Sequence, residues 1–168
     1  MQMDCPFCQI PSDRLFYEGD RVVGLWDRFP VSPGHALLIP RRHVPSWFEA
    51  TPAEQLELIQ ALEIARQEIG HRHRPDGYNI GINDGKAAGQ TVFHLHVHLI
   101  PRYAGDVDVP AGGVRHVIPE LANYLERPAD WSLPHEASLV RGEDDRSCPI
   151  FWGTSTWPVR WTLLSRSR

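Results

Sequence analysis

The chain has 168 residues, 42% of them hydrophobic and 23% charged, and a formal net charge of -4 with its histidines neutral. This suits one globular domain with a sizeable core, and the negative charge gives no general attraction to nucleic acid or acidic membranes. Because there is no apolar run near the roughly 20 residues of a membrane helix and no signal-peptide pattern, we expect a cytoplasmic protein that binds neither nucleic acid nor membrane.

The first motif along the chain is a cysteine pair, Cys5 and Cys8, with the spacing Cys-x-x-Cys. The pair could be half of a zinc site, a redox pair or two incidental thiols. Redox pairs of this spacing usually open a helix that follows a buried strand, and no strand pattern precedes residue 5. Zinc prefers four ligands at a closed structural site, so a zinc site would need two further side chains.

Alternating and continuous apolar runs bounded by turn residues predict an antiparallel sheet. The first two runs are joined across Gly19-Asp20, which is typical of a short hairpin turn. The strands are expected at residues 15–18, 21–26, 35–40, 78–82 and 93–100.

One long helix is expected between the third and fourth of these strands. Thr51 is its cap, Pro52 its first helical residue and Glu54 completes a capping box, while Gly70 is the expected end. The predicted fold is therefore α+β, an antiparallel β-sheet meander with one main helix packed on it. We divide the chain into a body, residues 1–128, and a C-terminal tail, residues 129–168, which has no clear period and is expected to be irregular or partly disordered.

The run 93–100 carries three histidines, His94, His96 and His98, which alternate with apolar residues. In an extended strand the three imidazoles share one face, while the apolar residues face the core. A core gains nothing from three adjacent imidazoles, so this face is the predicted functional site. The Cα atoms of the outer two would lie about 13 Å apart, whereas zinc–nitrogen bonds are about 2.0–2.1 Å long, which argues against one ion held by all three.

Two kinds of chemistry fit such a face: a metal site formed by two of the histidines, or nucleophilic catalysis. A neutral imidazole is a competent nucleophile because its reference pKa is about 6.5, and its attack on phosphorus gives a covalent phosphoramidate. A neighbouring imidazole can handle a proton or hold a phosphate oxygen. Donors for the phosphate precede the histidines at Asn83, Gly89, Gln90 and Thr91.

The segment Gly89-Gln90-Thr91 and the run that follows it resemble the signature of the histidine triad (HIT) family, His-x-His-x-His-x-x with apolar x. The resemblance covers about residues 4–127. It includes Trp26-Asp27, the run 35–40, His43 and residues 78–83. Residues 100–103 and 112–115 make the chain more similar to the dinucleoside polyphosphate hydrolases of the family than to its phosphoramidases.

The resemblance implies a HIT-like meander, usually a homodimer, that transfers a nucleotidyl group from an α-phosphate to a histidine and then to water or another acceptor. By position, His96 is the implied nucleophile, His98 bonds the phosphate or bridging oxygen, and His35 supports the histidine network. The implied substrate-binding residues are Trp26 and its apolar neighbours at the base, Asp27 at the ribose, and Asn83, Gly89, Gln90, Thr91 and His98 at the phosphate. Asp27 could instead be a turn cap, and Asn83 could form an Asx turn.

Family members with an N-terminal cysteine pair use two further histidines, which here correspond to His43 and His94. The resemblance thus implies a structural zinc held by Cys5, Cys8, His43 and His94, with no metal required for the chemistry.

We expect a hydrolase or transferase acting on an adenine nucleotide or dinucleoside polyphosphate. The alternatives are a nucleoside phosphoramidase of the same family, a metal-dependent hydrolase using two triad histidines, and a non-catalytic nucleotide sensor that uses its tail as a contact surface.

Overall fold

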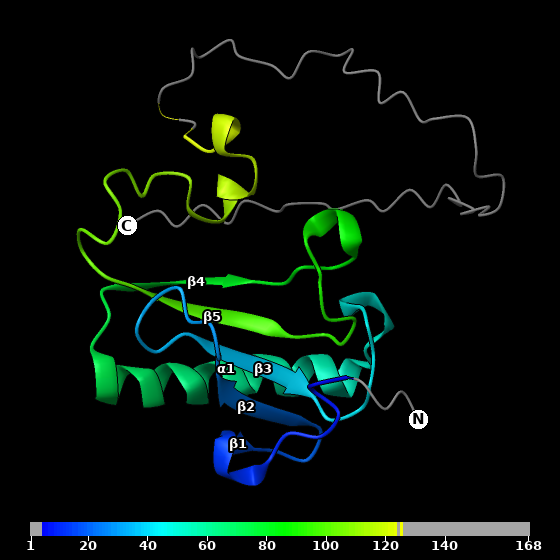
Figure 1. Cartoon of the computed structure of the whole chain (residues 1–168). Coiled ribbons are helices and arrows are strands. Elements are labelled where there is room, and N and C mark those ends of the chain that lie inside the picture. The colour runs from blue at the N-terminus through cyan, green and yellow to red at the C-terminus, as the bar shows by residue number, and fades with distance from the viewer. Residues whose placement is uncertain (1–4, 124, 126–168) are drawn as a thin grey trace, which may run out of the picture. The chain divides into compact units, whose positions relative to one another are not determined.

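A computed structural model describes residues 5–123 and residue 125, and one antiparallel sheet with one long helix forms its centre (Figure 1). The sheet order is β1-β2-β3-β5-β4, so β1 and β4 are the edges. This confirms the predicted α+β meander. The strands are β1 (Leu15–Glu18), β2 (Val22–Trp26), β3 (Ala36–Pro40), β4 (Gly77–Gly81) and β5 (Val97–Arg102).

The helix α1 (Pro52–His73) begins as its sequence predicts. The Thr51 hydroxyl accepts a hydrogen bond from the Glu54 backbone N–H at 3.3 Å, and the Glu54 carboxylate accepts one from the Thr51 N–H at 2.8 Å. The predicted end at Gly70 is wrong, because the helix continues to His73 and stops where Arg74 has a left-handed conformation, with φ 50°. A glycine inside a helix costs only about 1 kcal/mol, so Gly70 by itself does not end the helix.

The two faces of the sheet differ in what covers them. On one face, side chains of the strands pack against α1 and form the main core, which includes Val22, Ala36, Leu38, Val97 and Leu99. On the opposite face a smaller apolar cluster is covered by the N-terminal segment rather than by a helix. This second face is therefore the one with room for a ligand. Its cluster consists of Val23, Leu25, Leu37 and Ile39, with Phe7, Ile10 and Leu15 packed against it.

The strand that carries the triad begins later and ends later than predicted. β5 starts at Val97, because the chain before it turns to bond elsewhere: the Leu95 N–H donates to the Val44 carbonyl at 2.6 Å. Pro101 does not end the strand, since it lies beyond the last β3–β5 pair, where its missing N–H removes no bond to β3. Only His98 of the triad lies inside the strand, yet Leu95, like Val97 and Leu99, is buried in the core on the α1 side.

The predicted tail, residues 129–168, lies outside the described residues, so its predicted irregularity and the division of the chain at residue 128 stay predictions. Within residues 5–123, no helix has the length and apolar character needed to cross a membrane.

Candidate functional site

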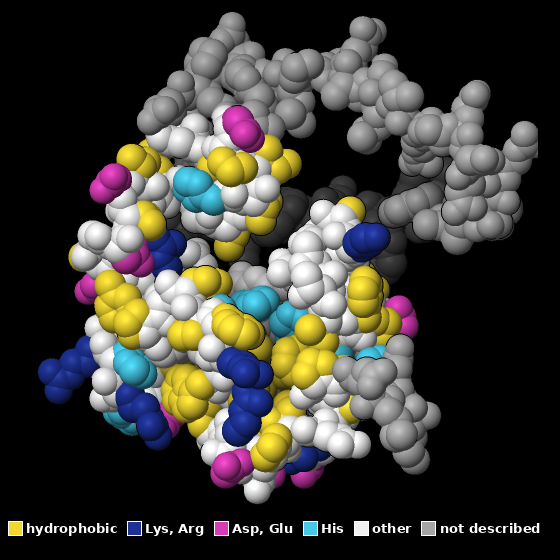
Figure 2. Space-filling view, in the orientation of Figure 1, with side chains coloured by type: hydrophobic (Ala, Val, Ile, Leu, Met, Phe, Trp, Pro, Cys, Tyr) yellow, Lys and Arg dark blue, Asp and Glu magenta, His cyan; other side chains and the backbone are white. Residues whose placement is uncertain are grey.

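A cavity of about 450 Å³ lies on the sheet face opposite α1, with His96 and His98 in its wall. This volume is within the range of small-molecule sites. Figure 2 shows histidine side chains near the middle of this face with hydrophobic side chains around them. The other residues of the wall are Pro6, Phe7, Arg14, Leu25, Asp27, Arg28, Phe29, Leu37, Thr91 and Val92. We call this space the histidine cavity.

His96 is held in one tautomer by the backbone. Its side chain is buried, and its Nδ1 lies 2.7 Å from the His94 carbonyl oxygen. Because a carbonyl oxygen can only accept, Nδ1 carries the proton and donates, and the lone pair lies on Nε2. The Phe7 ring contacts the imidazole edge-on with 5.2 Å between the ring centroids, which fixes its orientation further. The arrangement leaves the lone pair of Nε2 without a partner among these contacts, on a ring that lines the cavity.

A chain of hydrogen bonds behind the cavity sets the tautomer of His98. The Val31 N–H donates to His35 Nδ1 at 3.4 Å, and His35 Nε2 lies 3.0 Å from His98 Nδ1. Since a backbone N–H can only donate, Nδ1 of His35 is the acceptor and the ring carries its proton on Nε2. This Nε2–H donates a hydrogen bond to Nδ1 of His98, so the proton of His98 lies on its own Nε2. The Asp27 carboxylate lies 3.4 Å from His35 Nδ1, ready to pair with that ring if it gains a second proton.

Burial keeps both of these histidines neutral. Burial lowers the pKa of His98 to about 4, with the neighbouring His96 and His35 adding to the effect. Burial also lowers the pKa of His35, against the opposing attraction of Asp27. Within the described part of the chain, His98 Nε2 is a buried nitrogen with no hydrogen-bond partner. A buried N–H in this state is poised to donate to a ligand oxygen.

Only some of the residues predicted to bind the substrate line the histidine cavity. Asp27 and Thr91 line the histidine cavity, as the predicted roles require. The Asp27 carboxylate also accepts a hydrogen bond from the Phe29 N–H at 2.9 Å, so the turn-cap role that it could play is present as well. The other carboxylate oxygen of Asp27 lies 3.4 Å from His35 Nδ1. A contact of Asp27 with a ribose stays a prediction.

The loop before the triad is held together by Gln90. This side chain is buried; its oxygen accepts from the Gly85 N–H at 2.8 Å and its amide donates to the Pro45 carbonyl at 2.7 Å. Gly89 has a φ of 86°, a left-handed conformation that glycine adopts without strain. Asn83 follows β4 half-buried. The predicted phosphate contacts of Asn83, Gly89 and Gln90 stay predictions, and the structure gives Gln90 the additional task of shaping the loop.

Trp26 lies on the other side of the sheet from the histidine cavity, so its predicted place at the base pocket does not match the structure. Its ring packs on Phe16, with 4.5 Å between the centroids, and contacts the core beneath α1. Side chains alternate along a strand, so its neighbour Leu25 faces the histidines instead, together with Leu37 of β3. Leu25 is one of the apolar neighbours that the resemblance placed at the base pocket together with Trp26.

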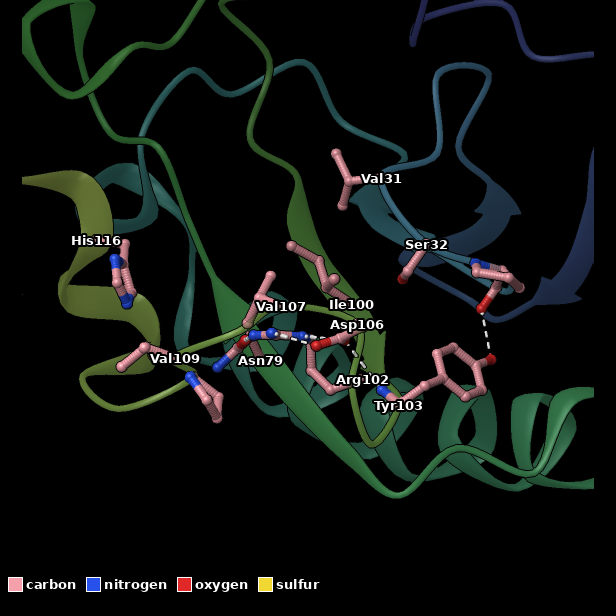
Figure 3. Close-up of a pocket in the computed structure, with 13 residues that line it drawn as sticks. Val31, Ser32, Asn79, Ile100, Arg102, Tyr103, Asp106, Val107, Val109 and His116 are labelled. Atoms are coloured by element: carbon pink, nitrogen blue, oxygen red, sulfur yellow. Dashed lines mark hydrogen bonds and ion pairs between the residues drawn. The ribbon is translucent and has the colours of Figure 1, made fainter. Parts of the chain in front are cut away.

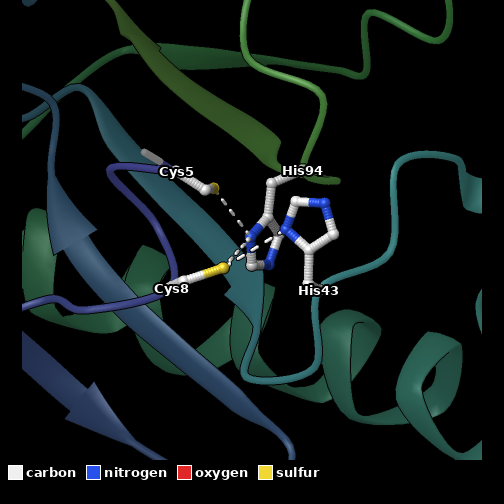
Figure 4. A group of neighbouring side chains, drawn as sticks. All are labelled: Cys5, Cys8, His43 and His94. Carbon is white, nitrogen blue, oxygen red and sulfur yellow. Dashed lines mark hydrogen bonds between the residues drawn. The ribbon is translucent and has the colours of Figure 1, made fainter. Parts of the chain in front are cut away.

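A second cluster of side chains joins the N-terminus to the triad (Figure 4). The ligand atoms of Cys5, Cys8, His43 and His94 all lie within 4.8 Å of one another. His94 Nδ1 is 3.4 Å from Cys5 Sγ, and His43 Nδ1 is 3.2 Å from Cys8 Sγ. The far nitrogen of His94 lies 2.8 Å from the Pro40 carbonyl oxygen, to which it donates.

These four side chains fit a structural zinc ion. Two thiolates and two imidazoles are a common tetrahedral zinc set. The bond from His94 to Pro40 is the outer contact that fixes the tautomer of a metal-ligating histidine, leaving Nδ1 free for the ion. The residues between the cysteines, Pro6 and Phe7, line the histidine cavity. The sequence analysis did not predict that Phe7 lines the cavity. Its position between Cys5 and Cys8, two candidate zinc ligands, could have indicated this.

The comparisons with known proteins agree with this geometry. Residues 9–105 match the family model of the HIT domain. The AP-4-A phosphorylase of Mycobacterium tuberculosis is 36% identical over 129 residues, which cover 73% of this chain and 66% of that protein. The asymmetrical bis(5'-nucleosyl)-tetraphosphatase of Schizosaccharomyces pombe is 39% identical over 101 residues, or 60% of this chain and 56% of the relative. The matched region thus spans less than two thirds of either enzyme.

A solved structure has the same fold. The crystal structure of a Zn-bound histidine triad family protein from Mycobacterium smegmatis matches with a TM-score of 0.56 and 36% sequence identity. The match covers 62% of this chain and 78% of that chain.

Proposed function

The chain belongs to the HIT family, and from this premise we propose that it is a nucleotide hydrolase or transferase acting at an α-phosphate through a nucleotidyl intermediate on His96. The observation that carries the proposal is the hydrogen bond from His96 Nδ1 to the His94 carbonyl, which gives the ring on the cavity wall an unprotonated Nε2. Two relatives are named for dinucleoside tetraphosphates, and their names support the same substrate class here.

In the first step, His96 Nε2 attacks the α-phosphorus of the nucleotide. A nitrogen–phosphorus bond forms, the bond from phosphorus to the leaving oxygen breaks, and its electron pair departs with that oxygen. The imidazole becomes cationic, and its Nδ1–H bond to the His94 carbonyl stabilises this charge. Splitting the displacement into two steps is the purpose of the intermediate.

His98 assists by hydrogen bonding rather than by full proton transfer. Its Nε2–H is a buried donor without a partner in the described structure, and the pKa of the ring, about 4, keeps it neutral. A polyphosphate departs as an anion, so a hydrogen bond to the leaving oxygen is sufficient help. In the second step, water attacks the phosphorus and an oxygen–phosphorus bond forms. The nitrogen–phosphorus bond breaks, its electron pair returns to His96 Nε2, and the nucleoside monophosphate is released while the proton lost by the water passes to the solvent.

The remaining residues of the cavity suit a nucleotide. Leu25, Leu37 and Phe7 supply apolar walls for a base, while Asp27 is an acceptor for ribose hydroxyls and Thr91 a donor for phosphate.

We infer that Cys5, Cys8, His43 and His94 hold a structural zinc, which anchors the N-terminal segment over the cavity. The zinc-bound relative supports this inference. The chemistry derived above needs no metal at the phosphorus.

A homodimer is also part of the proposal. The edge strand β4 carries Ile80, which is 50% exposed, and it lies beside an apolar depression lined by Trp47, Ile59 and Ile82. An exposed apolar edge of this kind favours pairing with a second copy. Light scattering of the purified protein tests this: a mass of one chain would remove the homodimer from the proposal.

The activity is tested by AMP release from diadenosine tetraphosphate, with a nucleoside phosphoramidate and AMP alone as comparison ligands. The proposal expects turnover of the tetraphosphate that persists after brief exposure to a chelator at a temperature where the protein stays folded. Immediate loss in chelator would instead support a metal-dependent hydrolase. Binding of AMP with no turnover of either substrate would support a nucleotide sensor, and faster turnover of the phosphoramidate would support a phosphoramidase.

A further inference from the structure

A second cavity, of about 430 Å³, lies next along the same sheet face (Figure 3). Ile100 and Arg102 of β5 form part of its wall, together with Asn79 of the edge strand β4. The chain that follows β5 closes it with Val107 and Val109. No predicted site residue lines this second cavity, and the mechanism above does not use it.

Two segments of the chain line both cavities. Along β5, His98 faces the histidine cavity, and Ile100 and Arg102 follow on the same face at steps of about 6.6 Å, two residues of strand rise. In the loop between β2 and β3, residues 27–29 line the histidine cavity, whereas residues 31–33 line the second one. The two cavities are therefore neighbours, with His98 next to the boundary between them.

The charges of the second cavity cancel within its own wall. The Arg102 guanidinium donates to the Asp106 carboxylate at 2.6 and 2.8 Å, and its third donor binds the Asn79 side-chain oxygen at 2.6 Å. These bonds use three of the five N–H donors of Arg102, and the Asp106 carboxylate neutralises its charge, so the second cavity offers no net positive charge to a phosphate. The rest of the wall is largely apolar, with Val31, Ile100 and Val107 among its members. Such a site suits an uncharged, flat-sided group with a few polar atoms.

The direction of the reaction points the leaving group toward this cavity. In an in-line displacement the leaving oxygen lies on the side of the phosphorus opposite to the attacking nitrogen. His96 attacks, His98 follows it in the chain and bonds the leaving oxygen, and the next residue on that face, Ile100, belongs to the second cavity. A leaving group that extends past His98 therefore reaches the second cavity.

We propose that the second cavity binds the nucleoside at the leaving end of a dinucleoside polyphosphate, so that the substrate lies across the histidines with one nucleoside in each cavity. This inference rests on the proposed function. The similar volumes, about 430 and 450 Å³, match a substrate whose two ends are alike. The phosphates span the boundary, and the neutral second cavity takes the uncharged nucleoside.

The test compares two substrates that share the attacked phosphate. Diadenosine tetraphosphate carries the second nucleoside, and adenosine 5'-tetraphosphate lacks it. Val109 lines the second cavity and is 53% exposed, so Val109→Trp narrows the cavity without disturbing the core. The matched control is Val117→Trp, at a residue that is 83% exposed and outside both linings.

Val109→Trp is expected to lower kcat/KM for diadenosine tetraphosphate at least tenfold and to change that for adenosine 5'-tetraphosphate less than twofold, whereas Val117→Trp changes neither. Equal effects of Val109→Trp on both substrates, or no effect on either, would overturn the proposal. A binding measurement distinguishes failure of this proposal from failure of the proposed function. With His96→Ala protein that turns over nothing, Val109→Trp must still weaken binding of diadenosine tetraphosphate selectively; if the chain binds neither compound, both proposals are wrong.

Discussion

Two histidine sites lie side by side in this protein and are built from one run of sequence, yet their rings are bonded in opposite ways. His94 is fully buried and has both ring nitrogens directed at protein groups, one at the Pro40 carbonyl and the other at the cysteine thiols. His96, two residues later, bonds the backbone through Nδ1 and keeps Nε2 for the cavity that it lines. The two histidines therefore differ in the partner of the second ring nitrogen, which is a protein group in His94 and is left for the cavity in His96.

This contrast predicts that neighbouring substitutions have opposite consequences. His96→Ala removes the proposed nucleophile but leaves the core intact, so it should lower kcat for AMP release at least about a thousandfold. The free energy of unfolding should change by no more than about 1 kcal/mol, because the ring lines a cavity rather than filling the core. Activity near the wild-type level in this variant would remove His96 from the chemistry.

His94→Ala should act mainly on stability. It deletes a fully buried side chain and leaves the Pro40 carbonyl without its donor, which costs about 2–4 kcal/mol in unfolding free energy. The variant should also lose bound zinc, measured by mass spectrometry of the metal content. Cys8→Ser is the matched control, since it removes one proposed ligand from an exposed position and should lower zinc content with a smaller loss of stability. An unchanged free energy of unfolding in His94→Ala would contradict the structural role assigned to His94.

The supporting chain behind the cavity should give an intermediate effect. His35→Ala removes the donor that fixes the tautomer of His98, so kcat is expected to fall by about ten- to a hundredfold, less than in His96→Ala. KM should change little, because His35 lies behind the wall. His71→Ala, an exposed position on α1, is the control and should behave as wild type. A loss equal to that of His96→Ala would assign His35 a direct part in the reaction.

The smallest expected effect is on the pH dependence of stability. The pKa of His98 is lowered from 6.5 to about 4 by burial, so between these pH values the unfolded chain binds a proton that the native state does not. His98 therefore favours unfolding increasingly as the pH falls through this window. His98→Asn should lose this contribution, and urea unfolding from pH 7 to pH 4 should show a shallower decline than in wild type. Parallel declines would mean that His98 titrates normally.

The sequence predicted the parts of this molecule that depend on local patterns. Strand alternation, the hairpin at Gly19-Asp20 and the capping box at Thr51 are all short-range features, and the structure contains each of them. The errors arose where distant residues intervene. The start of β5 is displaced because Leu95 bonds Val44, which no local pattern near the triad records.

In the candidate site, too, the features that depend on local sequence were predicted and those that depend on distant contacts were not. Spacing along the run argued against one ion held by all three histidines, and the resemblance assigned His94 to a zinc site and His96 to the chemistry. The structure places His94 with the cysteines and His96 on the cavity. The resemblance assigned Trp26 and its apolar neighbours to the base pocket, but strand alternation places Leu25 on that face and Trp26 on the opposite one. Phe7 and the second cavity were missed because both depend on how segments far apart in the chain meet on the sheet.

The central claim is that His96 Nε2 carries the nucleotidyl group between substrate and water, and rapid acid quench during turnover tests it most directly. Wild-type protein mixed with diadenosine tetraphosphate, quenched within one turnover and analysed by peptide mass spectrometry should show an adenylyl group on the peptide that contains His96. His98→Asn protein should show the same modified peptide at a reduced rate. Turnover with no adenylylated peptide, or with the group on another residue, would contradict the account.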